Sequence, residues 1–433
     1  MFYYIWFDLH IIYTMGTWYK MDTVGIIYAP TANKKWCGVF GVSAVMLSPI
    51  DKDILQLALN QTMKTFNFFN VRLKHGFFWY YLEEHKNCVE IEKQCKYPCS
   101  PFEVSKGKHL MRVVYSSHRI TVEFFHGLTD GSGGWIFLKA LLFRYLSLCG
   151  LQFDSDANSV CNIAQSPKLA TLNAYDKIAS PKNGFLNRKS NRAFKLNLPL
   201  AQGDRYYLTH FELDCTQLKA KAKNLIASVG ELLVAVLVLS IEYCKYSLSN
   251  NKKGNIVVNL SYDLRKRFDI QTLRNFFGHA LLEIQQTDLN IYEVLKQVQK
   301  CMRSVDDSYL LKCVNLNVSS KNNLFNKFVP LTIKKPILNL AYYMYGEKLA
   351  TISFSNYGQA VVPKQFLQHI DRFESSCGVA KSNRLIEASA VSFANKTVLT
   401  VCVKSESTVL EQNVSKQLSN LGLAVKIDSN RTQ

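Results

Sequence analysis

The sequence predicts an α/β protein of the α+β type, made of two similar domains that each carry a mixed β-sheet with helices. Its 433 residues exceed the length at which a chain usually folds around a single hydrophobic core. Strand-like and helix-like patterns occur together in both halves of the chain. Between them, residues 151–194 lose this periodicity and are rich in Asp, Asn, Ser, Pro and Lys, as expected of a crossover. The expected domains therefore span 15–175 and 205–433, joined by a linker at 176–204.

In the first half, local patterns predict the elements one by one. Residues 35–47 are rich in β-forming residues and predict a strand. Helical spacing over residues 51–66 predicts a helix, with Asp51 placed to cap its N-terminus. The stretch NVRLKHGFFWYYLEE, residues 70–84, predicts two strands joined by a short turn, and the aromatic and β-branched residues of 110–127 predict a hairpin.

The second half repeats this mixture of strands and helices. The apolar run LLVAVLVLSI, residues 232–241, is too short to span a bilayer and follows a capping box formed by Ser228 and Glu231, so we expect a buried helix. Two α/β layers lying side by side would form an interface cleft, a common place for ligands. The predicted elements are a strand at 205–213, a helical stretch at 216–246, strands at 255–262 and 278–285, a helix at 292–305, strands at 350–355, 387–393 and 397–403, and a helix at 409–421.

The net charge and the cysteine content indicate which partners and which redox environment this protein could have. A formal net charge of +19 suits nucleic acid, an anionic membrane surface, a phosphate-bearing ligand or simply a solvated basic surface. The basic clusters at 187–192 (NRKSNR) and 264–268 (LRKRF) are short and scattered, and no recognition motif accompanies them, so no nucleic-acid partner is expected. Twelve cysteines in a long chain without a convincing export signal favour a reduced, cytoplasmic protein.

The apolar N-terminal residues 1–14 do not have the pattern of a signal peptide or an anchor. They lack a basic n-region, contain Asp8 and His10, and are too few to span a bilayer. Two interpretations stay open, a real extension or a translation start at Met15. No transmembrane segment is expected in the chain.

The stretch TVEFFHGLTDGSGG, residues 121–134, contains the strongest candidate for a catalytic group. Strand parity places Val122, Phe124 and His126 on one face, so His126 ends an apolar row. The glycines that follow allow a sharp turn or a close approach to a neighbour, and Asp130 comes just before a helix-like run.

Two interpretations of this stretch are possible from the residues alone. In the structural one, a neighbouring carbonyl satisfies His126, and Asp130 or Ser132 caps the following helix. In the functional one, the turn aims His126 into a cavity, and Asp130 pairs with a cation to hold the loop.

A competing metal site lies in HKNCVEIEKQCKYPC, where four side chains are potential zinc ligands. Their spacing matches none of the recognised paired patterns, so no metal is expected. The chain also lacks a P-loop, GxSxG, HExxH or dinucleotide-binding fingerprint, which leaves hydrolase and nucleotide-binding functions without support. The four potential ligands are His85, Cys88, Cys95 and Cys99.

Several motifs together resemble one family. FFHGLTDGSGG is similar to the HxxxDG signature of the CoA-dependent acyltransferase superfamily, which includes chloramphenicol acetyltransferases, condensation domains, plant BAHD acyltransferases and alcohol acetyltransferases. The segments 263–284 (DLRKRFDIQTLRNFFGHALLEI), 352–366 (ISFSNYGQAVVPKQF) and 77–84 (FFWYYLEE) also resemble that family. The likeness is closest to bacterial alcohol acetyltransferase-like proteins and runs from about Trp18 to Asn430.

The resemblance implies two chloramphenicol-acetyltransferase-like domains that enclose an interface tunnel. His126 would be the general base, with no covalent acyl-enzyme. Asp130 would point away from the substrate and pair with Arg265. Candidate groups for stabilising the oxyanion are the backbone N–H groups around Gly131 and the polar side chains of Ser355 and Asn356.

Two departures from the family's patterns refine this expectation. The D-F-G-W-G stretch of the plant enzymes is absent, and SNYG at 355–358 stands at the comparable position. Phe125 stands where condensation domains and chloramphenicol acetyltransferases have a second histidine. Both observations lower the likeness to those branches.

The prediction is therefore an acyltransferase that moves an acyl group, most simply acetyl, from coenzyme A to a hydroxyl acceptor. Acyl-CoA would be a co-substrate, with no permanently bound cofactor, and its phosphates would give the basic surface a modest role. The alternatives are transfer to an amine or lipid acceptor, a donor held by an acyl carrier protein, and a non-catalytic binding protein of the same fold.

Overall fold

The computed structural model describes residues 17–33, 38–95, 97–153, 164, 166–180, 182, 193–203, 205–248, 254–322, 328–345, 347–378 and 386–431. The predictions made for residues 1–14, for the start of the 35–47 strand and for the basic cluster at 187–192 lie outside this range.

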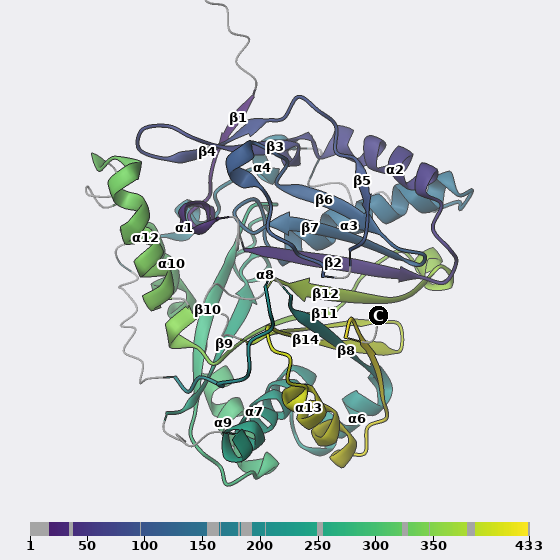
Figure 1. Ribbon diagram of the computed structural model, residues 1–433, viewed down its shortest axis with the longest axis vertical. Coiled ribbons are helices and arrows are strands. Elements are labelled where there is room, and N and C mark those ends of the chain that lie inside the picture. Colours follow the sequence, from purple (N-terminus) through teal and green to yellow (C-terminus); the bar gives the residue numbers. More distant parts are fainter. Residues whose placement is uncertain are drawn as a thin grey trace, which may run out of the picture.

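Within the described residues, three β-sheets form the framework (Figure 1). The five-stranded sheet has the order β12 (Ile370–Cys377), β2 (Val39–Met46), β7 (Arg119–Phe125), β6 (Met111–Tyr115) and β5 (Ile91–Lys93). The seven-stranded sheet has the order β10 (Phe277–Ile284), β9 (Ile256–Asp263), β11 (Ile352–Gln359), β13 (Ile386–Phe393), β14 (Lys396–Val403), β8 (Tyr207–Asp214) and β15 (Val425–Ser429). A small sheet contains β1 (Trp18–Lys20), β4 (Tyr80–Glu84) and β3 (Val71–His75).

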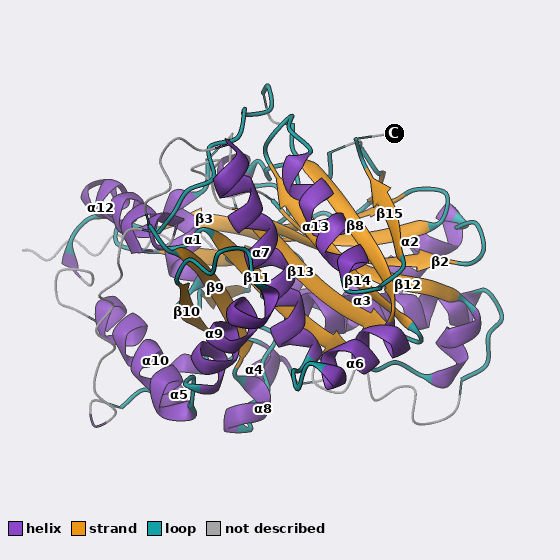
Figure 2. Ribbon diagram, turned by 90° about the horizontal axis from the view of Figure 1, so that it is seen from below, coloured by secondary structure: helices purple, strands orange, loops and turns teal. Residues whose placement is uncertain are grey.

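Both large sheets are mixed, which confirms the predicted class. Strand β11 runs parallel to β9 and β13, and β5 runs parallel to β6, whereas the other pairings of these two sheets are antiparallel. Helices α2 (Lys52–Thr65) and α3 (Gly131–Leu148) pack on the first sheet. Helices α7 (Val229–Leu248), α9 (Ile291–Arg303) and α13 (Val409–Asn420) cover one face of the second (Figure 2).

The predicted helix caps are present. Asp51 Oδ1 accepts the backbone N–H groups of Asp53 at 2.9 Å and Ile54 at 3.1 Å, so α2 begins where its sequence indicates. Before α7, the Glu231 carboxylate accepts the N–H of Ser228 at 2.7 Å, and the Ser228 hydroxyl accepts the N–H of Glu231 at 3.2 Å. This reciprocal pair is the predicted capping box.

The helical stretch predicted at 216–246 consists of two helices. Helix α6 (Cys215–Asn224) ends before Ile226, which adopts a left-handed conformation with φ of 54°. The capping box at Ser228 then starts α7, and the two helices are bent by 85°. No single helix among the described residues is long and apolar enough to cross a membrane, and α6 with α7 meets that criterion only as this bent pair.

The two halves of the chain are interlocked by strand β12. This strand comes from the second half but pairs antiparallel with β2 of the first, with Phe373 opposite Ala44. Phe373 is buried in the core of the first half. Strand β12 was not predicted, because its sequence IDRFESSC contains too many polar residues to show the pattern of a buried strand.

The remaining helices lie around these layers. Two further helices, α10 (Asp307–Asn322) and α12 (Leu331–Tyr345), were not predicted, and α12 contains Pro336. Helix α12 lies at the outside of the molecule next to α1 (Gly25–Thr31) (Figure 1). The short helices are α4 (Pro167–Ala170), α5 (Tyr175–Ile178) and α8 (Arg265–Phe268).

Candidate active site

A cavity of about 620 Å³ lies between the two large sheets. The first half contributes Val39 and Phe40 of β2 to its lining, and the second half contributes Ser261 of β9 and Ser355 of β11. His126 lines the same cavity. A cavity of this volume at an interface is in the range typical of small-molecule sites.

His126 follows the last residue of β7 and is half-buried among aromatic rings. Its backbone N–H donates to the carbonyl of Gly38 at 2.8 Å, which continues the pairing of β7 with β2. Its ring stacks on Tyr28 of α1, with ring centroids 4.6 Å apart and an angle of 3° between the planes. Phe40 and Phe277 lie against it at centroid distances of 5.0 Å and 5.6 Å.

The orientation of the imidazole is determined by Asn275, which lies just before β10. Asn275 Nδ2 donates to the carbonyl of His126 at 3.0 Å and to Asp22 Oδ2 at 2.9 Å. Both partners are acceptors, so the amide nitrogen faces them and the amide oxygen faces His126 Nδ1 at 3.1 Å. Nδ1 therefore carries the proton, and Nε2 is the basic nitrogen of the neutral ring.

Asp22 holds both Asn275 and the start of α1. Its Oδ2 also accepts the N–H of Asn275 at 3.2 Å, and its Oδ1 accepts the N–H groups of Val24 at 2.9 Å and Gly25 at 2.7 Å. Burial raises the pKa of Asp22, while these hydrogen bonds and the charge of Arg274 act in the opposite direction. Through α1, Asp22 also supports the ring of Tyr28.

The environment of His126 favours the neutral imidazole. Burial lowers its pKa, and the hydrogen bonds that the ring donates to its own backbone carbonyl and to Asn275, together with the charge of Asp130, only partly oppose this effect. A neutral imidazole with an accessible lone pair has the form required of a general base.

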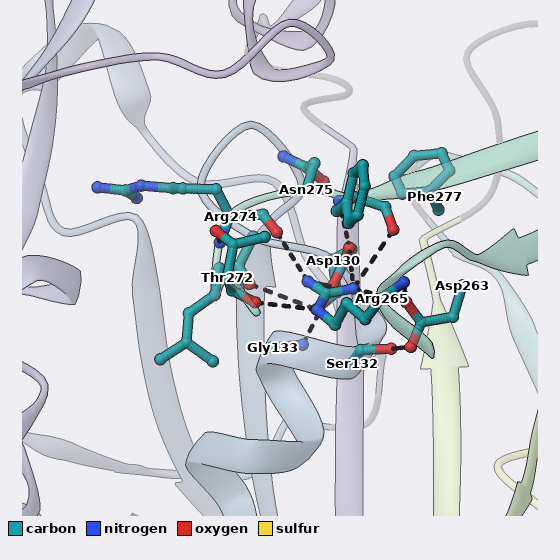
Figure 3. A network of polar contacts seen from close by, with 12 residues as sticks. Asp130, Ser132, Gly133, Asp263, Arg265, Thr272, Arg274, Asn275 and Phe277 are labelled. Atoms are coloured by element: carbon teal, nitrogen blue, oxygen red, sulfur yellow. Dashed lines mark hydrogen bonds and ion pairs between the residues drawn. The ribbon is translucent and has the colours of Figure 1, made fainter. Parts of the chain in front are cut away.

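Asp130 and Arg265 form a buried ion pair beside the His126 loop (Figure 3). Arg265 Nη2 donates to Asp130 Oδ1 at 2.9 Å, and Arg265 Nη1 donates to Asp130 Oδ2 at 3.0 Å. Asp130 Oδ1 also accepts the N–H of Gly133 at 3.0 Å, and its Oδ2 accepts the N–H of Phe276 at 2.7 Å. Asp130 is thus both the N-cap of α3 and the partner of a cation, so the two interpretations of this residue are compatible.

Arg265 also donates to acceptors at the end of β9 and in the segment that precedes β10. It donates to the carbonyls of Thr272 at 2.9 Å and Arg274 at 2.8 Å, and to Asp263 Oδ1 at 3.0 Å. Burial alone would lower the pKa of Arg265, but the charges of Asp130 and Asp263 raise it above its ordinary value. This cluster ties the loop after β7 to the segment that carries Asn275.

The glycines after His126 are required by close packing and not by a left-handed backbone. None of those between residues 127 and 134 has a positive φ. A Cβ on Gly133 would lie 2.8 Å from the carbonyl oxygen of Leu273, and a Cβ on Gly131 would lie 2.8 Å from Cζ of Tyr357. The chain also turns at residues 126–128, where the N–H of Leu128 donates to the carbonyl of Phe125 at 2.8 Å. Both expected features, a sharp turn and a close approach to neighbours, are therefore present.

The predicted oxyanion groups line the cavity from several elements. Gly131 begins α3, and Ser355 and Asn356 lie on β11. Asn356 is exposed, and its Oδ1 accepts the N–H of Gly358 at 3.0 Å. The sequence did not single out Tyr357, which belongs to β11 and packs edge-on against Trp135 of α3.

Two lysines line the cavity from α3 and α8. Lys139 Nζ donates to the carbonyl of Val361 at 3.3 Å, and Lys266 is exposed. Burial, and then the charge of Lys266, lower the pKa of Lys139. Two mutually repelling ammonium groups create a favourable position for an anion.

The alternative zinc ligands do not form a metal site. No group of three or more His, Cys, Asp or Glu side chains in the described residues is arranged to hold a metal ion. Cys99 is buried with its Sγ 3.3 Å from the hydroxyl of Ser376, whereas Cys88 and Cys95 are exposed. His85 Nδ1 accepts the backbone N–H of Asn87 at 3.1 Å.

Asn275, Asp22 and Tyr28 were assigned no role in the sequence analysis. Asn275 lies in the segment 263–284 that resembles the acyltransferases, which was a usable signal. Asp22 and Tyr28 lie in a segment without a recognisable motif, and only the fold brings them to His126.

Solved structures with a similar fold cover almost the whole chain. The chain is similar to the TRI3 trichothecene 15-O-acetyltransferase from Fusarium sporotrichioides, with 12% identity, a TM-score of 0.58, and 93% of this chain and 95% of that chain covered. Polyketide synthase associated protein 5 from Mycobacterium tuberculosis has 13% identity, a TM-score of 0.56, and coverage of 93% and 97%. A mutant starter condensation domain of rhizomide synthetase, in complex with C8-CoA and Leu-SNAC, has 9% identity, a TM-score of 0.56, and coverage of 94% and 94%.

These likenesses show that the chain has the two-domain α/β fold found in acetyltransferases and condensation domains. The predicted chloramphenicol-acetyltransferase-like architecture is thereby confirmed. No family model and no curated protein matches the sequence.

Proposed function

We propose that this protein is an acyltransferase that moves an acyl group, most simply acetyl, from coenzyme A to a hydroxyl acceptor. The observation that carries the proposal is the state of His126: a neutral imidazole, with Nδ1 bonded to Asn275, at a cavity between the two sheets. The similarity in fold to an O-acetyltransferase and to a condensation domain bound to C8-CoA supports this choice of acceptor and donor.

In the proposed reaction, His126 Nε2 removes the proton from the acceptor hydroxyl as the oxygen attacks the thioester carbonyl. A tetrahedral intermediate with one new C–O bond results. When it collapses, the C–S bond breaks, and the imidazolium returns the proton to the departing sulfur. The products are an ester and free coenzyme A, and no side chain of the protein becomes acylated.

The remaining site residues would act by position and by hydrogen bonding. The N–H groups at Gly131, the Ser355 hydroxyl and the Asn356 amide are candidate donors to the oxyanion. Asp130 and Arg265 would hold the loop of His126, because small displacements of a general base are costly to the rate. In this proposal, Asn275 and Asp22 keep Nε2 as the basic nitrogen of the ring.

The direct test uses the purified full chain, acetyl-CoA, and a panel of alcohols and amines. We expect thiol release that depends on an alcohol, with the acetyl ester identified by mass spectrometry. Transfer to amines alone would change the acceptor class, and transfer only from a carrier-protein thioester would change the donor class. Saturable binding of acyl-CoA without transfer to any acceptor would favour the non-catalytic binding protein.

A second test concerns the phosphates of the donor. Replacing both Lys139 and Lys266 by glutamine is expected to raise KM for acetyl-CoA, because two cations are removed from the edge of the cavity. The same variant should keep its KM for an acetyl-N-acetylcysteamine thioester, which has no phosphate. A control with Lys221 and Lys223 of α6 changed to glutamine loses the same charge away from the cavity. Equal KM changes in both double variants would contradict a phosphate role for the first pair.

A further inference from the structure

The second sheet contributes a polar wall to the cavity. Successive side chains of a strand point to opposite faces, so residues two apart in the chain share a face. Over residues 259–263 of β9 and 353–357 of β11, the cavity-lining residues at this spacing all carry a hydrogen-bonding group. We call these residues the polar strip: Asn259, Ser261, Asp263, Ser353, Ser355 and Tyr357.

One end of the polar strip lies at the loop that carries His126. The hydroxyl of Ser132, at the start of α3, donates to Asp263 Oδ2 at 2.8 Å (Figure 3). Tyr357 packs against the start of the same helix, because a Cβ on Gly131 would lie 2.8 Å from its Cζ. Asp263 and Tyr357 therefore mark the end of the strip that is nearest to the proposed base.

The far end of the polar strip is formed by Asn259 and Ser353. These residues lie opposite each other on the parallel strands β9 and β11. Asn259 precedes Asp263 by four residues, which corresponds to about 13 Å along a strand. Glu387 of β13 lies opposite Ser353 and lines the cavity as well. The strip thus leads from the His126 loop to a group of polar side chains on three strands.

The two lysines of the cavity lie beyond the other end of the polar strip. Lys139 Nζ donates to the carbonyl of Val361, which follows the end of β11, and Lys266 lies on α8, which follows β9. The cations that would contact the phosphates of the donor and the far end of the strip therefore lie toward opposite ends of these strands. This arrangement leaves the far end of the strip for the acceptor.

Three groups of the polar strip have no internal partner. Within the described residues, the side chains of Asn259, Ser353 and Ser355 form no hydrogen bond to the rest of the chain, and each is half-buried. The cavity wall that comes from the first half of the chain includes the apolar Val39 and Phe40. A bound molecule would thus meet hydrogen-bonding groups on one side and apolar side chains on the other. Sugars and alditols, which combine hydroxyl groups with C–H faces, have the matching character.

A purely apolar acceptor would fit the polar strip poorly. An alkyl chain lying on the strip would displace the water that reaches Asn259 and Ser353 without offering them a partner, and a desolvated polar group without a partner costs free energy. A site that hydrogen-bonds a hydroxyl group rejects an analogue without that group more strongly than an apolar pocket rejects an added hydroxyl. The strip therefore favours an acceptor with hydroxyl groups along its length.

We propose that the acceptor is an elongated, neutral molecule with several hydroxyl groups, such as a sugar or an alditol, which lies along the polar strip. One of its hydroxyl groups reaches His126 and becomes the ester oxygen, while more distant hydroxyl groups bond to Asn259 and Ser353. The Glu387 carboxylate accepts a hydrogen bond from the same region of the acceptor. This inference rests on the proposed acyl transfer and names the chemical class of its acceptor.

Isothermal titration calorimetry of the full chain tests this inference without depending on activity. Maltitol is the polyhydroxylated probe, 1-octanol is the apolar alcohol, and choline is a hydroxyl compound with a cationic group. We expect Kd for maltitol to be lower than that for either other probe by about tenfold or more, because only maltitol can bond along the strip. The inference is overturned if 1-octanol binds as tightly as maltitol. Tighter binding of choline would also overturn it and would assign the site to a cationic acceptor beside Glu387.

A double variant locates the binding surface. Asn259→Leu with Ser353→Ala is expected to raise Kd for maltitol by about tenfold, because two hydrogen bonds are lost. Asn413→Leu with Ser147→Ala is the matched control, since both side chains are half-buried and lie outside the cavity lining. Equal changes of Kd in the two double variants would contradict binding along the strip. Circular dichroism checks that each variant is folded.

Transfer assays with acetyl-CoA separate this inference from the proposed function. The Asn259 and Ser353 double variant should lower kcat/KM for maltitol by about tenfold and leave acetylation of ethanol unchanged, because ethanol is too short to reach these residues. Maltitol binding without transfer to any acceptor would contradict acyl transfer and leave the polyol site in place. Transfer to 1-octanol without any binding of maltitol would keep acyl transfer and refute the polyol acceptor.

Discussion

The His126→Ala variant is expected to lose about 10²- to 10⁴-fold in kcat, the usual contribution of a general base. The side chain is half-buried at the end of β7, and alanine removes the ring without adding a polar group. We therefore expect the variant to remain folded and to keep its KM for acetyl-CoA near that of wild type. Thiol release measured at saturating acceptor, with circular dichroism as the folding control, checks this result. Equal rates for wild type and variant would exclude His126 as the base.

The pH dependence of the wild-type reaction provides an independent check. Burial places the pKa of His126 below its ordinary value of 6.5, so the imidazole is neutral at pH 7 and above. Activity should therefore stay level on going from pH 7 to moderately alkaline pH. It should fall only when the pH drops through the lowered pKa, as the base becomes protonated. A rate that rises through pH 7 to 8 with one titrating group would contradict this assignment.

The Asn275→Ala variant tests how much of the rate depends on the orientation and tautomer of His126, with the imidazole itself still present. Without the amide oxygen, Nδ1 loses the partner that holds its proton, and the tautomer with a basic Nε2 is no longer selected. We expect kcat to fall by less than in His126→Ala. Because the hydrogen bond that His126 donates to Asn275 also raises the pKa of the imidazole, its loss should move the acidic limb of the pH profile to lower pH. A loss of activity with an unchanged pH profile would indicate a purely structural role.

Removing Arg265 is expected to have the largest effect on stability. In Arg265→Met, the Asp130 carboxylate stays buried without its cation, and breaking a buried pair in this way typically costs about 3–5 kcal/mol. The side chains of Arg265 and Asp130 are only 5% and 6% exposed, so water cannot replace the lost partner. Urea unfolding of wild type and variant measures the change in the free energy of unfolding. Activity should fall as well, since this pair holds the loop that carries His126.

Arg267→Met is the matched control on the same short helix. Arg267 pairs with Asp307 at 2.7 Å, but the two side chains are 35% and 58% exposed. Exposed ion pairs contribute about 0–1 kcal/mol, so this variant should unfold close to wild type and keep its activity. Similar losses of stability in Arg265→Met and Arg267→Met would contradict the special role of the buried pair.

Local patterns predicted much of this protein because they depend on neighbours in the chain. Asp51 caps α2 and Ser228 caps α7, since a cap needs only a side chain and the next few N–H groups. Strands and helices that are buried only by partners distant in the sequence were not predicted. Strand β12 is polar in its sequence, but pairing with β2 and burial of Phe373 make it part of the first sheet.

The sequence by itself determined the class of fold, the position of His126 at the end of a strand, and the expectation that Asp130 pairs with Arg265. The first two follow from periodicity along the chain, whereas the pairing of Asp130 with Arg265 was implied by the resemblance to the acyltransferase family. Only the tertiary structure decided the chemical state of the site. Asn275 is 149 residues from His126 and 253 residues from Asp22, and folding brings all three within hydrogen-bonding distance. The tautomer and the lowered pKa of the imidazole result from these distant partners and from burial, which no local pattern encodes.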